Sequence, residues 1–408
     1  MRALFVSSWL PEAQAATGFE IANRAIARGL EACGVELVPV GFRRPGAEAP
    51  RGPHLDLGPL AIENSGASRA RKAAWVVRAL RLGLTVSSAK LRVVDDATLR
   101  RRLDAVGQVD AVILSSVQMP IAYPLLTGIA PTVLIAHNVE HLSARENAVH
   151  ARSPVSRLLY AREARLLERG EAWLCREAAV VHTLAQDDAR RLGLEGDPRA
   201  VTLSLATGRE RGAGTNPGEP RVDVAMIGTW SWAPNRVGMD WFLQEVVPRL
   251  PPDVTIEIAG VFDGPPPAAP PQVRFRGRVP DAADFVRSSR VVAIATRGGT
   301  GVQLKTIETL EEGMPAVATP AALRGIGAVL PANVRVADDA ASFAGALAAL
   351  VAAVRAGEVR RLDGGAFAQR QNQGLLAGLS AGLSRLRPEA SAAGAWDGRE
   401  RRRRGVAA

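Results

Sequence analysis

The sequence has 408 residues, of which 47% are hydrophobic and 23% are charged. This length and composition are typical of a globular protein with two domains of ordinary size. No stretch reaches 18 uncharged apolar residues, so we expect no transmembrane helix, and the opening MRALFVSSWLPE is expected to be a first strand rather than a signal peptide.

The net charge is +10, and only three of the 51 basic residues are lysines: Lys72, Lys90 and Lys305. A coding bias toward arginine explains the trend as a whole, yet a basic excess also suits an anionic partner such as a membrane surface, a lipid phosphate or a nucleotide. Few aromatic residues and no recognised DNA- or RNA-binding signature argue against nucleic acid. Cys33 and Cys175 lie far apart in the sequence and form no motif. This suits a reducing cytoplasm, where a cysteine usually acts as a small apolar residue.

Short β-rich runs alternate with helical patterns through the first half of the chain, which predicts a parallel sheet with helices on both faces. The expected strands are Ala3–Ser8, Glu36–Phe42, Asp110–Ser116, Thr132–His137, Ala179–Thr183 and Val201–Leu205. The expected helices lie at about Phe19–Cys33, Ser68–Val86, Ala97–Val106, Ser156–Glu177 and Ala185–Leu192.

The pattern starts again after residues 206–220, a stretch rich in Gly, Pro and Thr that we interpret as a linker. The strands expected there are Asp223–Gly228, Thr255–Val261, Val273–Arg278, Val291–Ala295 and Ala316–Thr319, with helices at about Val237–Leu250, Gly301–Glu312 and Ala340–Ala356. The sequence therefore predicts two Rossmann-like, doubly wound α/β domains that face each other across a cleft.

We place the first domain at residues 1–206, the linker at 207–222 and the second domain at 223–358. A late helix, at about 359–387, is long enough to reach back toward the first domain. The basic tail, residues 388–408, is expected to be disordered.

The most informative stretch is TRGGTGVQLKTIETLEEGMP, residues 296–315, which follows the apolar run Val291–Ala295. Glycines between a strand and a helix let the backbone approach a ligand and free the first amides of the helix. Lys305 lies in the first turn, where its charge and the helix dipole together suit a diphosphate. Glu308 follows one helical step later and suits ribose hydroxyls. The alternative is an ordinary glycine-rich turn with a solvated lysine.

The stretch GGTGVQLKTIETLEEGMPAVAT resembles the donor-site motif of the GT-B glycosyltransferases of family 4, the glycosyl transferases group 1. VAMIGTWSWAPNRVGMDWFLQEVVPRL resembles the start of the C-terminal domain of that family, and TVLIAHNVEH resembles its N-domain strand that ends in histidine. The matching residues are Gly298, Gly299, Gly301, Lys305, Glu308, Gly313, Pro315, Val317 and Thr319, with Gly228, Thr229, Pro234 and Asn235. The resemblance implies a GT-B fold and transfer from a nucleotide sugar with retention of configuration.

Two positions depart from the family pattern. The first of two glutamates eight residues apart would fall at Thr300, whereas Glu308 matches the second. We expect backbone amides near Thr300 and Gly301 to hold the donor sugar instead. No Arg/Lys-x4-Lys pair follows Gly228, and Arg236 is the nearest basic residue.

Four of the five histidines lie between residues 137 and 182. His137 and His141 flank Glu140, which suggests zinc, but His137 lies at a strand end and no third ligand is evident. The resemblance implies that His137 projects into the cleft near the donor sugar. The alternative for His137, and the leading interpretation for the other histidines, is a structural role.

The loop after the first strand is SSWLPEAQAATGFEIANRA, in which Gly18 matches the glycine of a family loop that covers the cleft. The amides of Gly18 and Phe19 are expected to open a helix and to suit an anion, although a plain helix cap fits equally well. No Asp-x-Asp triplet occurs. We therefore expect no metal and no cofactor, because a lysine and helix amides can neutralise a leaving diphosphate.

Residues 69–102 carry eight arginines and two lysines, interleaved with apolar residues such as Trp75 and Leu80. This basic amphipathic region is expected either to rest on an anionic membrane that supplies a lipid-linked acceptor, or to be a solvated helix face over a core stripe.

The leading hypothesis is a glycosyltransferase that moves a sugar from a nucleotide donor to a glycan or lipid-linked acceptor in the polysaccharide biosynthesis of a bacterial envelope. It would work in the cytoplasm, at the inner face of the membrane. One alternative is a non-catalytic nucleotide-sugar-binding or scaffold protein of the same fold. Another, a nicotinamide-dependent enzyme, requires Gly-x-Gly-x-x-Gly after the first strand, which SSWLPEAQAATGFE lacks. The predicted catalytic residues are His137 and Lys305, and the predicted donor-binding residues are Gly18, Gly228, Thr229, Gly299, Thr300, Gly301, Lys305 and Glu308.

Overall fold

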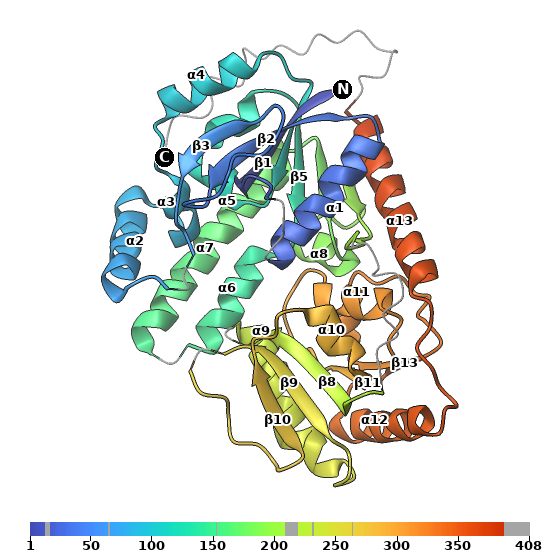
Figure 1. The fold of residues 1–408 in the computed structure, drawn as a ribbon. Coiled ribbons are helices and arrows are strands. Elements are labelled where there is room, and N and C mark those ends of the chain that lie inside the picture. The colour runs from blue at the N-terminus through green and yellow to red at the C-terminus, as the bar shows by residue number, and fades with distance from the viewer. Residues whose placement is uncertain are drawn as a thin grey trace.

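The computed structural model describes residues 1–12, 17–63, 66–151, 153–208, 219–230, 232–262 and 264–386, with only the backbone of Ala233 and Pro234. The expected basic tail and most of the expected linker lie outside the described residues. Figure 1 shows two α/β domains, each with a sheet between layers of helices, and with the C-terminal helix lying alongside both.

The first domain is built on a seven-stranded parallel sheet with the order β3-β2-β1-β4-β5-β6-β7. The central strands β4 and β5 are buried along their whole length, because helices cover both faces of the sheet. The strands are β1 (Arg2–Trp9), β2 (Glu36–Arg43), β3 (Leu55–Pro59), β4 (Ala111–Ser115), β5 (Thr132–Ala136), β6 (Val180–Thr183) and β7 (Ala200–Thr202).

The first domain differs from the expectation in several of its helices and in one edge strand. The helix expected at Ser68–Val86 is two helices, because Gly83 takes a left-handed φ of 67° that ends the first one and Thr85 caps the second. Helices α5 and α6 and strand β3 were not expected. The helices are α1 (Gly18–Ala32), α2 (Arg69–Leu82), α3 (Val86–Leu91), α4 (Asp96–Val106), α5 (Gln118–Ala122), η1 (Pro124–Gly128), α6 (Glu140–Val149), α7 (Pro154–Glu177) and α8 (Gln186–Arg191).

The second domain repeats this architecture with a six-stranded parallel sheet of order β10-β9-β8-β11-β12-β13. Its strands are β8 (Val222–Thr229), β9 (Ile256–Val261), β10 (Val273–Gly277), β11 (Ser289–Ile294), β12 (Ala316–Ala318) and β13 (Val334–Val336). Its helices are α9 (Ala233–Trp241), η2 (Phe242–Val246), η3 (Val247–Arg249), α10 (Ala282–Arg287), α11 (Leu304–Glu311), η4 (Pro320–Leu323) and α12 (Ala340–Arg355). The prediction of two doubly wound domains is therefore confirmed.

The last helix, α13 (Gly365–Ser384), runs back across the first domain. Gly374, Gly378 and Gly382 recur every four residues on one of its faces, and a Cβ atom on any of them would come within 2.7 Å of the end of the first sheet. One cluster of buried apolar residues extends from Ile26 of α1 through Leu379 of α13 to Leu310 of α11. The two domains therefore share a core through this helix. None of the described helices is both long and apolar enough to cross a membrane.

Candidate functional site

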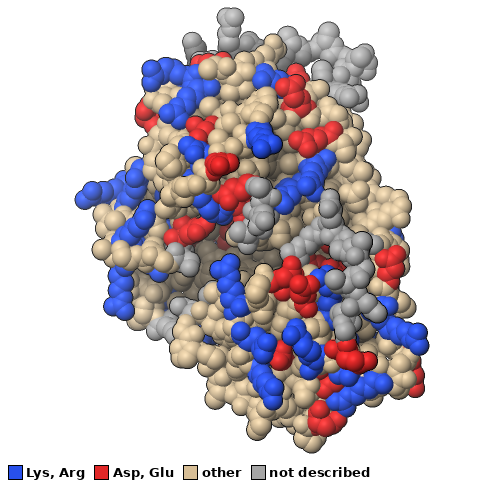
Figure 2. All heavy atoms as spheres, in the orientation of Figure 1, with Lys and Arg blue, Asp and Glu red and all other residues tan. Residues whose placement is uncertain are grey.

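The segments that follow β1 and β5 in the first domain meet the segment that follows β11 in the second. Leu304 Cδ1 lies 2.9 Å from the position that a Cβ atom on Gly18 would occupy, and the carbonyl oxygen of His137 lies 2.5 Å from that position on Gly301. The carboxyl ends of the two parallel sheets therefore face each other, which is where doubly wound folds bind ligands. Figure 2 shows a hollow in the molecular surface between the two domains.

Two helix N-termini meet at this junction, because Gly18 is the first residue of α1 and Leu304 is the first residue of α11. Thr17 and Glu20 cap α1 reciprocally, through bonds from the Glu20 amide to Thr17 Oγ1 (3.4 Å) and from the Thr17 amide to Glu20 Oε2 (2.9 Å). Within the described part of the chain, no hydrogen bond is recorded from the amides of Gly18 and Phe19, or of Val302, Gln303, Leu304 and Lys305. Open amides at the positive ends of two helices form an anion site.

Lys305 lies in the first turn of α11, where the sequence predicted it. Its ammonium donates a hydrogen bond to Asn235 Oδ1 at 2.8 Å and lies 5.9 Å from the centre of the Trp230 ring. No carboxylate partner of Lys305 is recorded among the described residues. Burial lowers the pKa of Lys305 to about 8, because the charged form is poorly solvated. The ammonium is therefore held in place without being neutralised, as a site for a phosphate requires.

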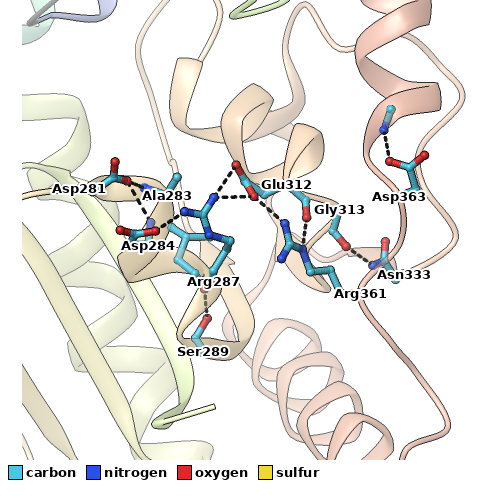
Figure 3. A network of polar contacts seen from close by, with 12 residues as sticks. Asp281, Ala283, Asp284, Arg287, Ser289, Glu312, Gly313, Asn333, Arg361 and Asp363 are labelled. Carbon is cyan, nitrogen blue, oxygen red and sulfur yellow. Dashed lines mark hydrogen bonds and ion pairs between the residues drawn. The ribbon is translucent and has the colours of Figure 1, made fainter. Parts of the chain in front are cut away.

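The far end of α11 is anchored by the polar network shown in Figure 3. Glu312, directly after the helix, accepts hydrogen bonds from Arg287 at 3.1 and 3.2 Å and from Arg361 at 2.6 Å. These two arginines come from α10 and from the segment before α13. Asn333 Nδ2 also donates to the carbonyl oxygen of Gly313 at 2.9 Å. The network fixes the helix that carries Lys305, so the open amides at its other end have a defined position.

His137 lies at the end of β5 in a chain of hydrogen bonds that defines its tautomer. The Ser115 hydroxyl donates to Asn23 Oδ1, and Asn23 Nδ2 donates to Ser7 Oγ at 3.0 Å. Since the only proton of Ser115 is used, His137 Nε2, at 2.8 Å from Ser115 Oγ, must be the donor of that bond. Burial lowers the pKa of His137 to about 4, so the ring is neutral and Nδ1 is an acceptor. The Phe19 ring packs against it, with centroids 4.7 Å apart.

Thr300 lies in the contact between the domains rather than on an open surface. It is 4% exposed, its Oγ1 accepts a hydrogen bond from the Val139 amide at 3.1 Å, and the same oxygen lies 3.2 Å from Ser143 Oγ. Both partners belong to the first domain, at the start of α6. Position 300 therefore helps to hold the two domains together.

The amides on either side of Thr300 are already engaged. The Gly299 amide donates to Glu146 Oε1 at 3.0 Å, and the Gly301 amide donates to Asp188 Oδ2 at 2.8 Å. The amides of Gly299 and Gly301 are therefore not open to a sugar, because carboxylates of the first domain accept their protons. For the Thr300 amide, and for the amides from Val302 to Lys305, no hydrogen bond is recorded in the described part of the chain.

Gly228 and Thr229 end β8 on the second domain, beside Lys305. The Thr229 carbonyl accepts a hydrogen bond from Asn235 Nδ2 at 3.2 Å, which orients the amide that holds the lysine. A Cβ atom on Gly228 would lie 3.0 Å from the buried Trp230 ring. Arg236 is exposed and its recorded ion pair is with Asp240 at 3.8 Å, so it points to a partner on its own helix.

Glu308, one turn after Lys305, is half-buried and borders a cavity of about 610 Å³. The cavity lies between the end of the first domain, α11 and α13. Its lining includes Ala206, Gly208, Glu311, Gln369 and Asn372.

The residues of the zinc interpretation have other partners in the structure. His141 Nδ1 lies 2.6 Å from Glu171 Oε2, and the Glu140 amide donates to the other oxygen of Glu171 at 2.7 Å. His137 Nε2 is committed to Ser115. Among the described residues, no group of three or more His, Cys, Asp or Glu is arranged to hold a metal ion.

Three comparisons place this geometry among known proteins. Residues 221–353, which span β8 to α12, match the family model described as "Glycosyl transferases group 1". No curated protein matches the sequence. Similar solved structures include sucrose-phosphate synthase from Thermosynechococcus elongatus, at 12% identity and a TM-score of 0.62, covering 94% of this chain and 98% of that one.

The fold is GT-B. Two further structures of this fold have TM-scores of 0.53: Anabaena HepE in complex with UDP-glucose, at 12% identity over 92% of this chain and 100% of that one, and the pneumococcal O-GlcNAc transferase GtfA in complex with UDP and GlcNAc, at 8% identity over 94% and 98%. At such identities the likeness establishes the fold. The GT-B arrangement places its cleft between the two sheets, where Gly18, His137 and Lys305 lie here.

Sequence reasoning missed the residues that orient the site from the first domain: Asn23, Ser115, Glu146 and Asp188. Their side chains lie outside the motif that carries Lys305, and each acts through a contact more than 20 residues away in the chain. Only Ser115, at the carboxyl end of a predicted strand, had a signal in the sequence.

Proposed function

We propose that the protein is a retaining glycosyltransferase of family 4 that moves a sugar from a nucleoside-diphosphate donor to a glycan or lipid-linked acceptor, without a metal, in polysaccharide biosynthesis. The observation that carries the proposal is the meeting of two helix N-termini beside an ammonium for which no carboxylate partner is recorded among the described residues. The family match of the second domain supports it, as do the complexes of Anabaena HepE with UDP-glucose and of pneumococcal GtfA with UDP and GlcNAc.

The departing diphosphate determines what the second domain must do. As the bond to the sugar breaks, negative charge builds on the phosphate oxygen, and preorganised donors stabilise it at little reorganisation cost. The amides from Val302 to Lys305 and the Lys305 ammonium are such donors, and Asn235 keeps the ammonium in place. Gly18 and Phe19 add the amides of α1 from the opposite side. Glu308 accepts the ribose hydroxyls.

The first domain acts on the sugar. His137 is neutral, with its Nε2 proton given to Ser115, so its Nδ1 accepts a hydrogen bond from a sugar hydroxyl and orients the ring. The domains are in contact at residues 300 and 301, which excludes water from the donor. The acceptor hydroxyl attacks the face that the diphosphate leaves, and a phosphate oxygen takes its proton. This order of steps retains the configuration of the anomeric carbon of the sugar.

A second candidate function is a nucleotide-sugar-binding protein without turnover. The buried position of Thr300 favours it, since no carboxylate at position 300 faces the sugar. The two functions share a binding site and differ only in the transfer step.

A panel of nucleotide sugars, including UDP-glucose, UDP-GlcNAc and GDP-mannose, tests both functions. A rise in Tm with one donor identifies the base and the sugar. Release of UDP or GDP in the presence of lipid extract or oligosaccharide then measures transfer. Stabilisation with transfer supports the enzyme, and stabilisation without transfer supports the binding protein. No stabilisation by any donor contradicts both.

We further propose that the first domain rests on an anionic membrane at the inner face of the cell envelope. The basic stretch forms α2 to α4, and Figure 2 shows Lys and Arg along the edge where α2 lies in Figure 1. Arg162 of α7 donates to the Ala79 carbonyl of α2 at 3.0 Å, so the start of α7 lies beside this edge. There, Val155 and Leu158 are 78% and 69% exposed.

Sedimentation with vesicles tests this contact. Wild-type protein is expected to pellet with vesicles of phosphatidylcholine and 30% phosphatidylglycerol, and less with phosphatidylcholine alone. Leu158→Glu should reduce the pelleted fraction, whereas Val336→Glu, at a 49% exposed site on the second domain, should not. Equal loss in the two variants would mean that charge alone, and not this surface, governs binding.

A further inference from the structure

We propose that Asp188, on helix α8 of the first domain, is a positioning residue for the phosphate-binding amides of the second domain. The inference rests on the function proposed above and deepens it, because it makes donor binding depend on the contact between the domains. Asp188 does not reach the ligand. It acts through the backbone of Gly301, three residues before the start of α11.

Asp188 is a buried carboxylate aimed at a backbone amide of the other domain. The side chain is 0% exposed, and its Oδ2 accepts the Gly301 amide at 2.8 Å. Its second oxygen lies 3.4 Å from Arg191 Nη1. A buried carboxylate needs such partners, so this contact is a stable part of the closed arrangement.

The rest of the glycine corner, Gly298–Gly301, is equally well bonded. The Gly298 carbonyl accepts Arg324 Nη2 at 2.9 Å and the Gly299 amide donates to Glu146 at 3.0 Å. The Gly301 carbonyl accepts Arg324 Nε at 3.4 Å. Side chains bond each of these three groups, and together with Asp188 two carboxylates of the first domain accept amides of the corner.

Directly after the corner, several consecutive amides have no recorded acceptor. From Val302 to Lys305 no amide hydrogen bond is recorded in the described chain. Gly301 has a φ of 72°, and a change in its orientation would turn the Val302 peptide as well. The bond to Asp188 therefore fixes the direction in which the first open amide points, and the amides that follow it in the helix keep that direction.

Charge distinguishes this positioning role from a purely structural one. Asparagine at position 188 keeps an oxygen that accepts the Gly301 amide but removes a negative charge near the diphosphate site. Alanine removes both. If Asp188 acts by positioning, the two substitutions should have different effects on anion binding, and asparagine should preserve it.

The experiment measures the affinity of UDP and GDP by titration calorimetry, together with the Tm of the unliganded protein. Asp188→Ala is expected to weaken binding of the nucleotide about tenfold, because the open amides are then no longer fixed in the binding orientation before the ligand arrives. Asp188→Asn should stay within about threefold of wild type or bind more tightly. Asp187→Asn, on the exposed side of the same helix, is the control and should change nothing. Asp188→Ser, too short to reach Gly301, replaces the alanine variant if that variant does not fold.

The inference is overturned if the alanine or serine variant keeps wild-type affinity while its Tm falls, or if the asparagine variant loses as much affinity as alanine. A failure of the proposed function has another signature, because wild-type protein and Lys305→Ala would then both show no nucleotide binding. That result would overturn the positioning role as well, since there would be no phosphate site to position.

Discussion

Replacing Lys305 by methionine should have opposite effects on two quantities. It should weaken the binding of UDP and stabilise the folded, unliganded protein. Two unit charges about 4 Å apart interact by about 4 kcal/mol at an effective dielectric of about 20. The hydrogen bond to Asn235 and the desolvation of the ammonium offset part of this energy. We therefore expect Lys305→Met to weaken UDP binding by about 2–3 kcal/mol, or roughly 30- to 150-fold.

The pH dependence of binding follows from the same residue. The pKa of Lys305 is about 8 in the unliganded protein, and a diphosphate raises it because it stabilises the charged form. Affinity for UDP should therefore be constant below about pH 7.5 and fall by up to tenfold per unit above pH 8. Calorimetry at pH 7, 8 and 9 measures this slope, and the methionine variant should not show it.

The stability of the unliganded protein should change with pH in the direction opposite to the UDP affinity. It should rise as the pH increases above 8. The pKa of Lys305 falls from 10.5 to about 8 on folding, so the folded state binds fewer protons between these values and is disfavoured below pH 8. Because the side chain keeps some exposed surface, we expect Lys305→Met to stabilise the unliganded protein by about 1–3 kcal/mol at pH 7. A variant that is less stable than wild type and still binds UDP normally would refute this reasoning.

Four further substitutions test the remaining parts of the site. His137→Ala should reduce turnover at least tenfold with UDP affinity within about twofold, and Ser115→Ala should reduce turnover less; a loss of UDP affinity in either would contradict the placement of His137 on the sugar. Asn235→Ala should weaken UDP about fivefold in calorimetry, and an unchanged affinity would mean that the ammonium needs no support. Thr300→Glu puts a third carboxylate beside the two already bonded to the glycine corner, so Tm should fall by several degrees and transfer should not improve; a gain in transfer would argue that position 300 faces the sugar.

The fold was predictable because its signals are local. Continuous apolar runs such as Val291–Ala295 indicate buried parallel strands, and glycines after them indicate turns into helices. The wrong and missing elements also result from relying on local signals. A helix was expected through Gly83 because its flanks are helical, whereas the left-handed conformation of that glycine ends α2. Strand β3 was missed because it lies at the edge of the sheet and only its middle residue is buried.

The site was predictable on the second domain and much less so on the first. Lys305 and the open amides after Gly301 follow from one contiguous stretch, since a helix and its N-terminus are local features. The tautomer of His137 depends on Ser115 and Asn23, which lie on two other elements. Such a chain of hydrogen bonds exists only after the sheet has assembled, and no spacing in the sequence encodes it.

The sequence and the structure lead to different interpretations of Thr300. The sequence presents a threonine where the resembling family often has glutamate, which reads as the loss of a sugar-binding group. In the structure this position is 4% exposed and its hydroxyl is bonded to the first domain. Carboxylates of that domain accept the amides on both sides of it. A glutamate here would bury a third carboxylate beside those of Glu146 and Asp188, whereas a threonine hydroxyl can accept the Val139 amide. The threonine therefore suits the way the domains join here, with a hydroxyl in the corner and the carboxylates of Glu146 and Asp188 on the domain that contacts it.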